Sequence, residues 1–177
     1  SPVKKCALEH NIPIFQPTKI RLDYQPILDA QPDLIVTAAY GQIVGMKLLN
    51  APKYRSINVH ASLLPKYRGG APIHYSVMNG DSETGVTIMY MEKTMDSGDI
   101  LNQRAIPIED DDTTGSMFEK LSIVGRDLLM ETILSEIKSF TEVSMKKCNL
   151  IGMNIPATGF GKYRLLDMNQ SFFISNT

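Results

Sequence analysis

The sequence predicts an α/β fold, an open and mostly parallel sheet with helices on its flanks. Two apolar runs, at residues 34–39 and 56–60, lack polar alternation and are typical of strands buried on both faces. A segment able to form a helix lies between them at 42–50, so the two strands should be parallel and joined by a crossover. Only residues 92–98 separate two later predicted strands. So short a link favours an antiparallel edge near the C-terminal end of the sheet.

The composition fits one domain with room for the edge of another. The chain has 177 residues, of which 43% are hydrophobic and 21% charged, and its formal net charge is −1. This charge excludes nucleic-acid binding through an overall basic surface. Any such binding would need a local patch of basic residues. Two cysteines, Cys6 and Cys148, are too few for a disulfide scaffold, which favours a reducing, cytoplasmic compartment. No apolar run is long enough for a membrane span, so no membrane partner is expected.

The first elements of the chain are short and have clear end signals. A Ser-Pro pair at the N-terminus is typical of a helix start, and helical spacing of apolar residues continues this helix to about Asn11. A short extended piece is expected at 12–15, and a short helix at 24–30 should end before Pro32. The two buried strands and the helix between them follow.

Longer elements are expected after residue 70. A helix at 71–78 opens with a proline and closes with an Asn-Gly pair, and strands are expected at 86–91 and 99–108. A long amphipathic helix, capped at 112–114, should lie on the sheet. Its apolar residues, spaced at three and four, are Met117, Phe118, Leu121, Val124, Leu128, Leu129, Ile133, Ile137 and Phe140.

Asn58 and His60 are candidate functional residues at the end of a predicted strand. Their spacing of two places both side chains on one face of the strand. The C-terminal end of a strand in an open parallel sheet is where such folds place their sites. An amide donor beside an imidazole suits acyl transfer, in which an oxyanion develops and a proton moves. The alternative is a turn-forming Asn and a capping His.

The loop that contains Asp96 and Asp99 supplies a candidate carboxylate partner for Asn58 and His60. Asp96 is able to pair with His60 and to orient it, although Asp-Ser-Gly is also a frequent turn composition. Ser62 lacks the G-x-S-x-G elbow of a serine hydrolase. No phosphate-loop pattern occurs, and no His, Cys and carboxylate cluster at metal-ligand spacing is recognised, so no metal is expected.

Two stretches resemble the folate-dependent formyltransferases, and among them the methionyl-tRNA formyltransferases. The first is INVHASLLPKYRGGAP from Ile57, and the second is NGDSETGVTIMYMEKTMDSGDIL from Asn79. The resemblance runs from about Ser1 to Phe140 and also includes AYGQI from Ala39. It implies the Rossmann-like formyltransferase sheet, with the first strands of that sheet missing from this sequence.

The resemblance also implies an activity, a set of ligands and a set of site residues. The family moves a formyl group from 10-formyltetrahydrofolate to an amine, here the amino group of methionyl-initiator tRNA, in support of translation initiation. By motif position the catalytic residues are Asn58, His60 and Asp96. The turn of Ser62, Leu63, Leu64 and Pro65 is similar to the segment that contacts folate. The implied partners are folate and charged initiator tRNA, and the implied state is a monomer.

The resemblance divides the chain at residue 140. Residues 1–140 are expected to form a partial catalytic domain whose N-terminal part is missing. Residues 141–177, which show no clear periodicity, are expected to be a linker and the start of a truncated tRNA-binding domain. Two alternatives remain open, namely another 10-formyltetrahydrofolate-dependent formyltransferase, with a nucleotide or amino-sugar acceptor, and an inactive folate-binding fragment.

Overall fold

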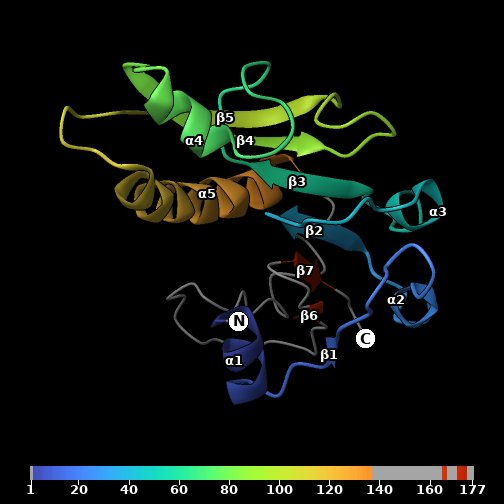
Figure 1. Ribbon diagram of the computed structural model, residues 1–177. Helices are drawn as coiled ribbons and strands as arrows, with labels where there is room; N and C mark the ends of the chain where they lie inside the picture. The colour runs from blue at the N-terminus through green and yellow to red at the C-terminus, as the bar shows by residue number, and fades with distance from the viewer. Residues whose placement is uncertain (1, 137–164, 167–170, 175–177) are drawn as a thin grey trace. The chain divides into compact units, whose positions relative to one another are not determined.

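The computed structural model describes residues 2–136, 165–166 and 171–174 (Figure 1). These residues divide between two compact units. The first contains residues 2–57 together with 165–166 and 171–174, and the second contains residues 58–136. Strand β3 (Ser56–His60) begins in the first unit and ends in the second.

The first unit contains short helices and strands, most of which were predicted. In chain order they are α1 (Pro2–Glu9), β1 (Ile14–Phe15), α2 (Gln25–Asp29), β2 (Leu34–Ala38), α3 (Met46–Leu49), β6 (Leu165–Leu166) and β7 (Ser171–Ile174). The strand order in this unit is β3-β2-β7. The Ile35 N–H donates to the Arg55 carbonyl and the Thr37 hydroxyl to the Ile57 carbonyl. Both bonds join residues 20 apart, so β2 and β3 are parallel, as predicted.

β2 is the apolar centre of the first unit. Leu34, Ile35 and Val36 are fully buried, although their side chains point alternately to opposite faces. Burial of each such side chain contributes roughly 1.5–3 kcal/mol. The prediction of a strand covered on both faces is therefore confirmed.

The predicted helix at 42–50 was too long, since α3 begins only at Met46. Gln42 lies outside the helix because its side chain bridges two backbone groups of an earlier segment. Its Oε1 accepts from the Ile20 N–H at 3.0 Å, and its Nε2 donates to the Thr18 carbonyl at 3.2 Å. Gly45 has an extended backbone and starts the helix. The side-chain contacts of Gln42 thus compete with helix formation.

Two strand pairs of the first unit were not predicted. β7 pairs antiparallel with β2, and β6 pairs parallel with β1. Both β6 and β7 come from the part of the chain that showed no periodicity. The predicted domain boundary at residue 140 lies outside the described residues and stays a prediction.

The second unit contains a hairpin covered by a long helix. Its elements are α4 (Pro72–Met78), β4 (Glu83–Tyr90), β5 (Ile100–Pro107) and α5 (Thr114–Glu136), and its strand order is β5-β4-β3. β4 and β5 are antiparallel, as their short loop predicted. Helix α5 packs on both strands (Figure 1). Gly125 lets it approach closely, because a Cβ there would lie 3.2 Å from the Val59 side chain.

Most of the predicted apolar face of α5 is buried, including Met117, Leu121 and Leu128. The prediction was wrong for Phe118, whose side chain is half exposed. Met117 occupies the inward position, and the next residue is turned by about 100° around the helix axis. Ile137 and Phe140 lie outside the described residues.

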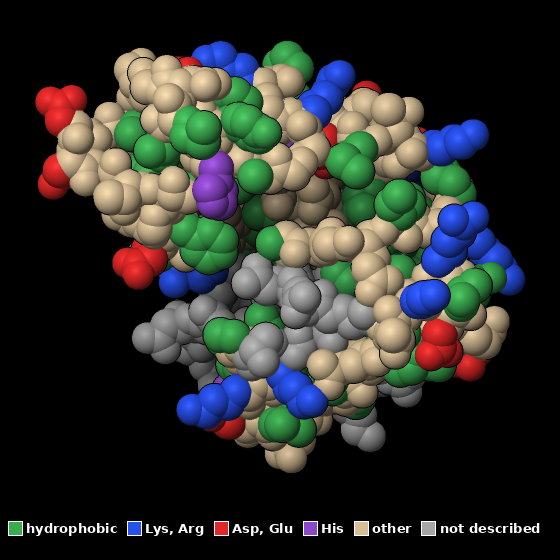
Figure 2. Space-filling view, in the orientation of Figure 1, with side chains coloured by type: hydrophobic (Ala, Val, Ile, Leu, Met, Phe, Trp, Pro, Cys, Tyr) green, Lys and Arg blue, Asp and Glu red, His purple; other side chains and the backbone are tan. Residues whose placement is uncertain are grey.

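Figure 2 shows the charged side chains on one face of the described residues. On the face shown in Figure 2, Lys and Arg lie at several separate places, with Asp and Glu among them. This matches the net charge of −1. Within the described parts of the chain, no helix is both long and apolar enough to cross a membrane.

Candidate active site

The site begins at His60, the last residue of β3, whose side chain is only 6% exposed. Its Nε2 lies 3.0 Å from the Tyr67 carbonyl oxygen. A carbonyl only accepts, so Nε2 carries a proton and donates it. Its Nδ1 lies 3.6 Å from Asp96 Oδ2, a separation typical of an ion pair rather than a hydrogen bond. Both ring nitrogens therefore face oxygen acceptors.

Asp96 is held in place by the backbone around it. Its Oδ2 also accepts a 2.8 Å hydrogen bond from the Gly69 N–H, and its side chain is 12% exposed. The residue has φ +48°, in the left-handed region that few non-glycine residues adopt. Two residues later, Gly98 has no room for a Cβ, which would lie 2.1 Å from the Tyr90 carbonyl oxygen. The loop from β4 to β5 is thus tightly folded beneath the carboxylate.

Asn58 precedes His60 by two residues on β3 and is half-buried. Strand geometry places the two side chains on the same face, as the spacing predicted. All three predicted catalytic residues lie in the second unit. The structure brings His60 and Asp96 together, and Asn58 lies two residues before His60 on the same strand.

The predicted folate-contacting turn follows β3 and is anchored by its backbone. Ser62 is fully buried and donates a 2.6 Å hydrogen bond to the Lys66 carbonyl. Leu64 is also buried, and its N–H donates to Thr87 Oγ1 at 3.1 Å. The peptide bond between Leu64 and Pro65 is cis, and Pro65 is exposed. Of these four residues, Ser62 and Leu64 hold the turn together.

Leu63 lines a cavity of about 210 Å³ beside the turn. The other lining residues are Lys66, Tyr67, Asp81, Glu83 and Thr84. Leu63 reaches this position because Gly85 has no side chain, since a Cβ there would lie 2.6 Å from Leu63 Cδ2. The cavity therefore joins one predicted folate-contacting residue to Tyr67, whose carbonyl oxygen holds His60.

The sequence profile of a family described as formyl transferase matches residues 18–133. This range covers more than half of the chain and includes every predicted site residue. The chain belongs to the formyl transferase family.

The relatives of this formyl transferase include proteins named methionyl-tRNA formyltransferase. The one from Lactiplantibacillus plantarum is 64% identical over 135 residues, which are 75% of this chain and 43% of the relative. The one from Listeria monocytogenes is 58% identical over 134 residues, again 75% of this chain and 43% of the relative. The chain thus spans less than half the length of these curated relatives.

Solved structures of other formyl transferases share the fold. Phosphoribosylglycinamide formyltransferase from Bacillus halodurans superimposes with a TM-score of 0.61 at 33% identity, over 76% of this chain and 65% of the other. Glycinamide ribonucleotide transformylase 1 from Geobacillus kaustophilus gives a TM-score of 0.66 at 31% identity, over 77% of each chain. The predicted α/β class is confirmed as a mixed sheet with flanking helices.

Sequence reasoning about this formyl transferase missed the groups that support the site. Thr87 donates from its hydroxyl to the Ser62 carbonyl at 2.7 Å. Gln103 Nε2 donates at 2.9 Å to both the Leu64 carbonyl and Thr87 Oγ1. A buried threonine and an exposed glutamine on neighbouring strands carry no local pattern. The Tyr67 carbonyl also left no signal in the sequence, because every residue has a backbone carbonyl.

Proposed function

We propose that this chain forms the catalytic part of a methionyl-tRNA formyltransferase. The proposed reaction moves a formyl group from 10-formyltetrahydrofolate to the amino group of methionine on charged initiator tRNA. The relatives at 58–64% identity that carry this enzyme's name support the choice of acceptor. The observation that carries the chemistry is the ion pair of His60 with Asp96, two residues 36 positions apart.

The proposed chemistry is an acyl transfer through a tetrahedral centre. The amine nitrogen attacks the formyl carbon, and the electron pair of the carbonyl moves onto its oxygen. The Asn58 amide donates a hydrogen bond to that oxygen, a type of stabilisation typically worth about 2.7–4 kcal/mol per donor. In the proposed step a protonated His60 also donates to it, through the Nε2–H that faces the Tyr67 carbonyl before substrate binds, while its Nδ1 stays beside Asp96. The oxyanion then collapses, and the bond between the formyl carbon and the folate nitrogen breaks. The proton lost by the amine passes to the folate nitrogen through water beside Asp96.

The proposed folate-binding residues divide by exposure. Leu63 faces the cavity, and exposed Pro65 is accessible to a ring-containing ligand. Ser62 and Leu64 are buried, so they would serve the ligand by fixing the turn. We expect no metal in this reaction, since an imidazolium and an amide supply the stabilisation.

Charged initiator tRNA, a monomeric state and a cytoplasmic location all stay predictions that rest on this function. The alternative acceptor is a nucleotide, because solved relatives named phosphoribosylglycinamide formyltransferase have the same fold at 28–33% identity. The higher identity to the tRNA-directed relatives favours tRNA.

A chimera tests the acceptor. In it, the part of this chain that matches the Lactiplantibacillus plantarum relative replaces the corresponding 135 residues of that relative. We expect the chimera to formylate charged initiator tRNA with 10-formyltetrahydrofolate, and to leave glycinamide ribonucleotide unmodified. The variant His74→Ala, at an exposed position of α4, is the matched control and should keep full activity. A folded chimera that formylates only the nucleotide would refute the proposal.

A further inference from the structure

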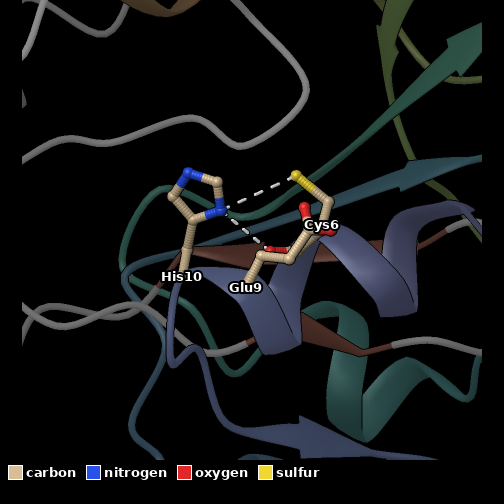
Figure 3. A group of neighbouring side chains, drawn as sticks. All are labelled: Cys6, Glu9 and His10. Atoms are coloured by element: carbon tan, nitrogen blue, oxygen red, sulfur yellow. Dashed lines mark hydrogen bonds between the residues drawn. The ribbon is translucent and has the colours of Figure 1, made fainter.

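A cluster of metal-ligating side chains lies at the end of α1, in the first unit. Cys6, Glu9 and His10 extend toward one another from the last turn of the helix (Figure 3). Their ligand atoms all lie within 4.8 Å of one another. The expectation that no His, Cys and carboxylate cluster exists was therefore wrong. The spacing of three and four residues, which places side chains on one helical face, was the signal that could have revealed it.

We propose that Cys6, Glu9 and His10 form a binding site for a zinc ion. A thiolate, an imidazole and a carboxylate are the three side-chain ligand types of zinc in proteins. Zn–S and Zn–N bonds of about 2.3 and 2.0 Å in a tetrahedron place sulfur and nitrogen roughly 3.5 Å apart. Cys6 Sγ and His10 Nδ1 are 3.9 Å apart, so a small rotation of either side chain completes the chelate.

The backbone that carries the cluster is well defined. Helix α1 ends in a Schellman motif, with Asn11 at φ +55°, the Ile12 N–H bonded to the Ala7 carbonyl and the Asn11 N–H to the Leu8 carbonyl. His10 is thereby fixed at the C-cap of the helix. The carbonyl groups at this end make the local field negative, which favours a cation.

Zinc binding displaces one contact and leaves the helix intact. His10 Nδ1 lies 2.9 Å from the Cys6 carbonyl oxygen, and that bond is exposed to water. The same carbonyl also accepts the His10 backbone N–H at 3.2 Å, so it keeps a partner when the ring moves to a metal. Cys6 is half-buried and Glu9 and His10 are exposed, which leaves the fourth zinc position open to water.

Titration of the metal-free chain with zinc, in competition with a chromophoric chelator, measures the site. We expect one tight zinc ion per chain. Cys6→Ser and His10→Gln should each weaken binding by at least about tenfold, with a smaller loss for Glu9→Gln. Circular dichroism establishes that each variant keeps its helices. The matched controls Cys148→Ser and His74→Gln should bind zinc as the parent does.

Alkylation of the thiols provides a second readout that does not depend on affinity. Zinc should slow maleimide labelling of Cys6, followed in the Cys148→Ser variant so that Cys6 is the thiol that is labelled. Cobalt in place of zinc should give a thiolate charge-transfer band that Cys6→Ser abolishes. Tight binding that persists unchanged in folded Cys6→Ser or His10→Gln, or that is lost in Cys148→Ser, would overturn the proposal. So would a chain that binds no zinc.

Discussion

His60 is held between two oxygen acceptors, and each depends on a residue in an uncommon backbone conformation. The carbonyl belongs to Tyr67, at φ +57°, and the carboxylate to Asp96, at φ +48°. Left-handed conformations in non-glycine residues persist only where the surroundings enforce them. Here the Tyr67 side chain is anchored, since its hydroxyl lies 2.8 Å from Asp81 Oδ2 and 3.0 Å from Asn79 Nδ2. The ring of His60 is thus fixed on both sides before any substrate binds.

The first prediction at this scale concerns Asn58. Asn58→Ala in the chimera should lower kcat for formyl transfer by about 100-fold or more, because one oxyanion donor is lost. Folate binding, measured by fluorescence titration, should stay close to normal, since the amide acts mainly on the transition state. Unchanged turnover would remove Asn58 from the mechanism.

Gly98 offers a test of the loop that carries Asp96. A Cβ at this position would meet the Tyr90 carbonyl oxygen, so Gly98→Ala must shift the loop. We expect kcat to fall by roughly 10–100-fold, because a displaced carboxylate no longer aligns His60. The control is Gly115→Ala, where the nearest atom would lie at an ordinary 3.6 Å. Equal activity of the two variants would show that the position of Asp96 is immaterial.

The sequence predicted which residues form the candidate site, but it did not predict the groups that hold them in place. Asn58 and His60 follow from strand periodicity, and Asp96 from its place in a tight loop, with their roles implied by the resemblance. The Tyr67 carbonyl and the Gly69 N–H are backbone groups, and only the folded loop shows which of them points inward. Thr87 and Gln103 become visible only when β4 and β5 pair.

At the scale of elements, the start of α5 shows how one side chain organises a helix terminus. Hydrogen bonds from the Lys120 ammonium, then from the Ser116 hydroxyl and the Glu109 N–H, lower the pKa of Asp112 to about 2. Its ordinary pKa is 3.8. Because the pKa is lower in the folded state, the ionised carboxylate stabilises the fold above about pH 4. This contribution disappears as the pH falls from 4 toward 2.

Asp112→Asn should therefore unfold at a lower urea concentration than the parent at pH 7. The difference between the two midpoints should shrink as the pH is lowered from about 4 to about 2, where the parent carboxyl also becomes neutral. Urea titrations across this range measure it, with Asp110→Asn as the control at an exposed neighbouring position. A midpoint difference that is constant with pH would contradict the assignment.

Helix α5 also shows what periodicity can and cannot supply. The spacing of its apolar residues predicted the helix and most of its buried face. It did not separate buried Met117 from half-exposed Phe118, because the spacing of three and four fits both residues. The closeness of α5 to the strands depends on Gly125 and Val59, a pair that no pattern within the helix identifies.

At the scale of the whole molecule, buried strands were the most predictable part of the fold. The apolar runs at β2 and β3 and the short loop between β4 and β5 led to the correct strand directions. The pairing of β7 with β2 was missed, because an antiparallel partner from far along the chain leaves no local trace in either strand. Family membership rests on residues 18–133, which include the full predicted site.

The central claim is that His60 and Asp96 act as one unit in formyl transfer, and a double-mutant cycle tests it directly. The parent chimera, His60→Ala, Asp96→Ala and the double variant are compared by kcat/KM for charged initiator tRNA. If the two groups work together, the double variant should be little worse than the more damaged single variant. Losses that add up independently in the logarithm of kcat/KM would contradict the account.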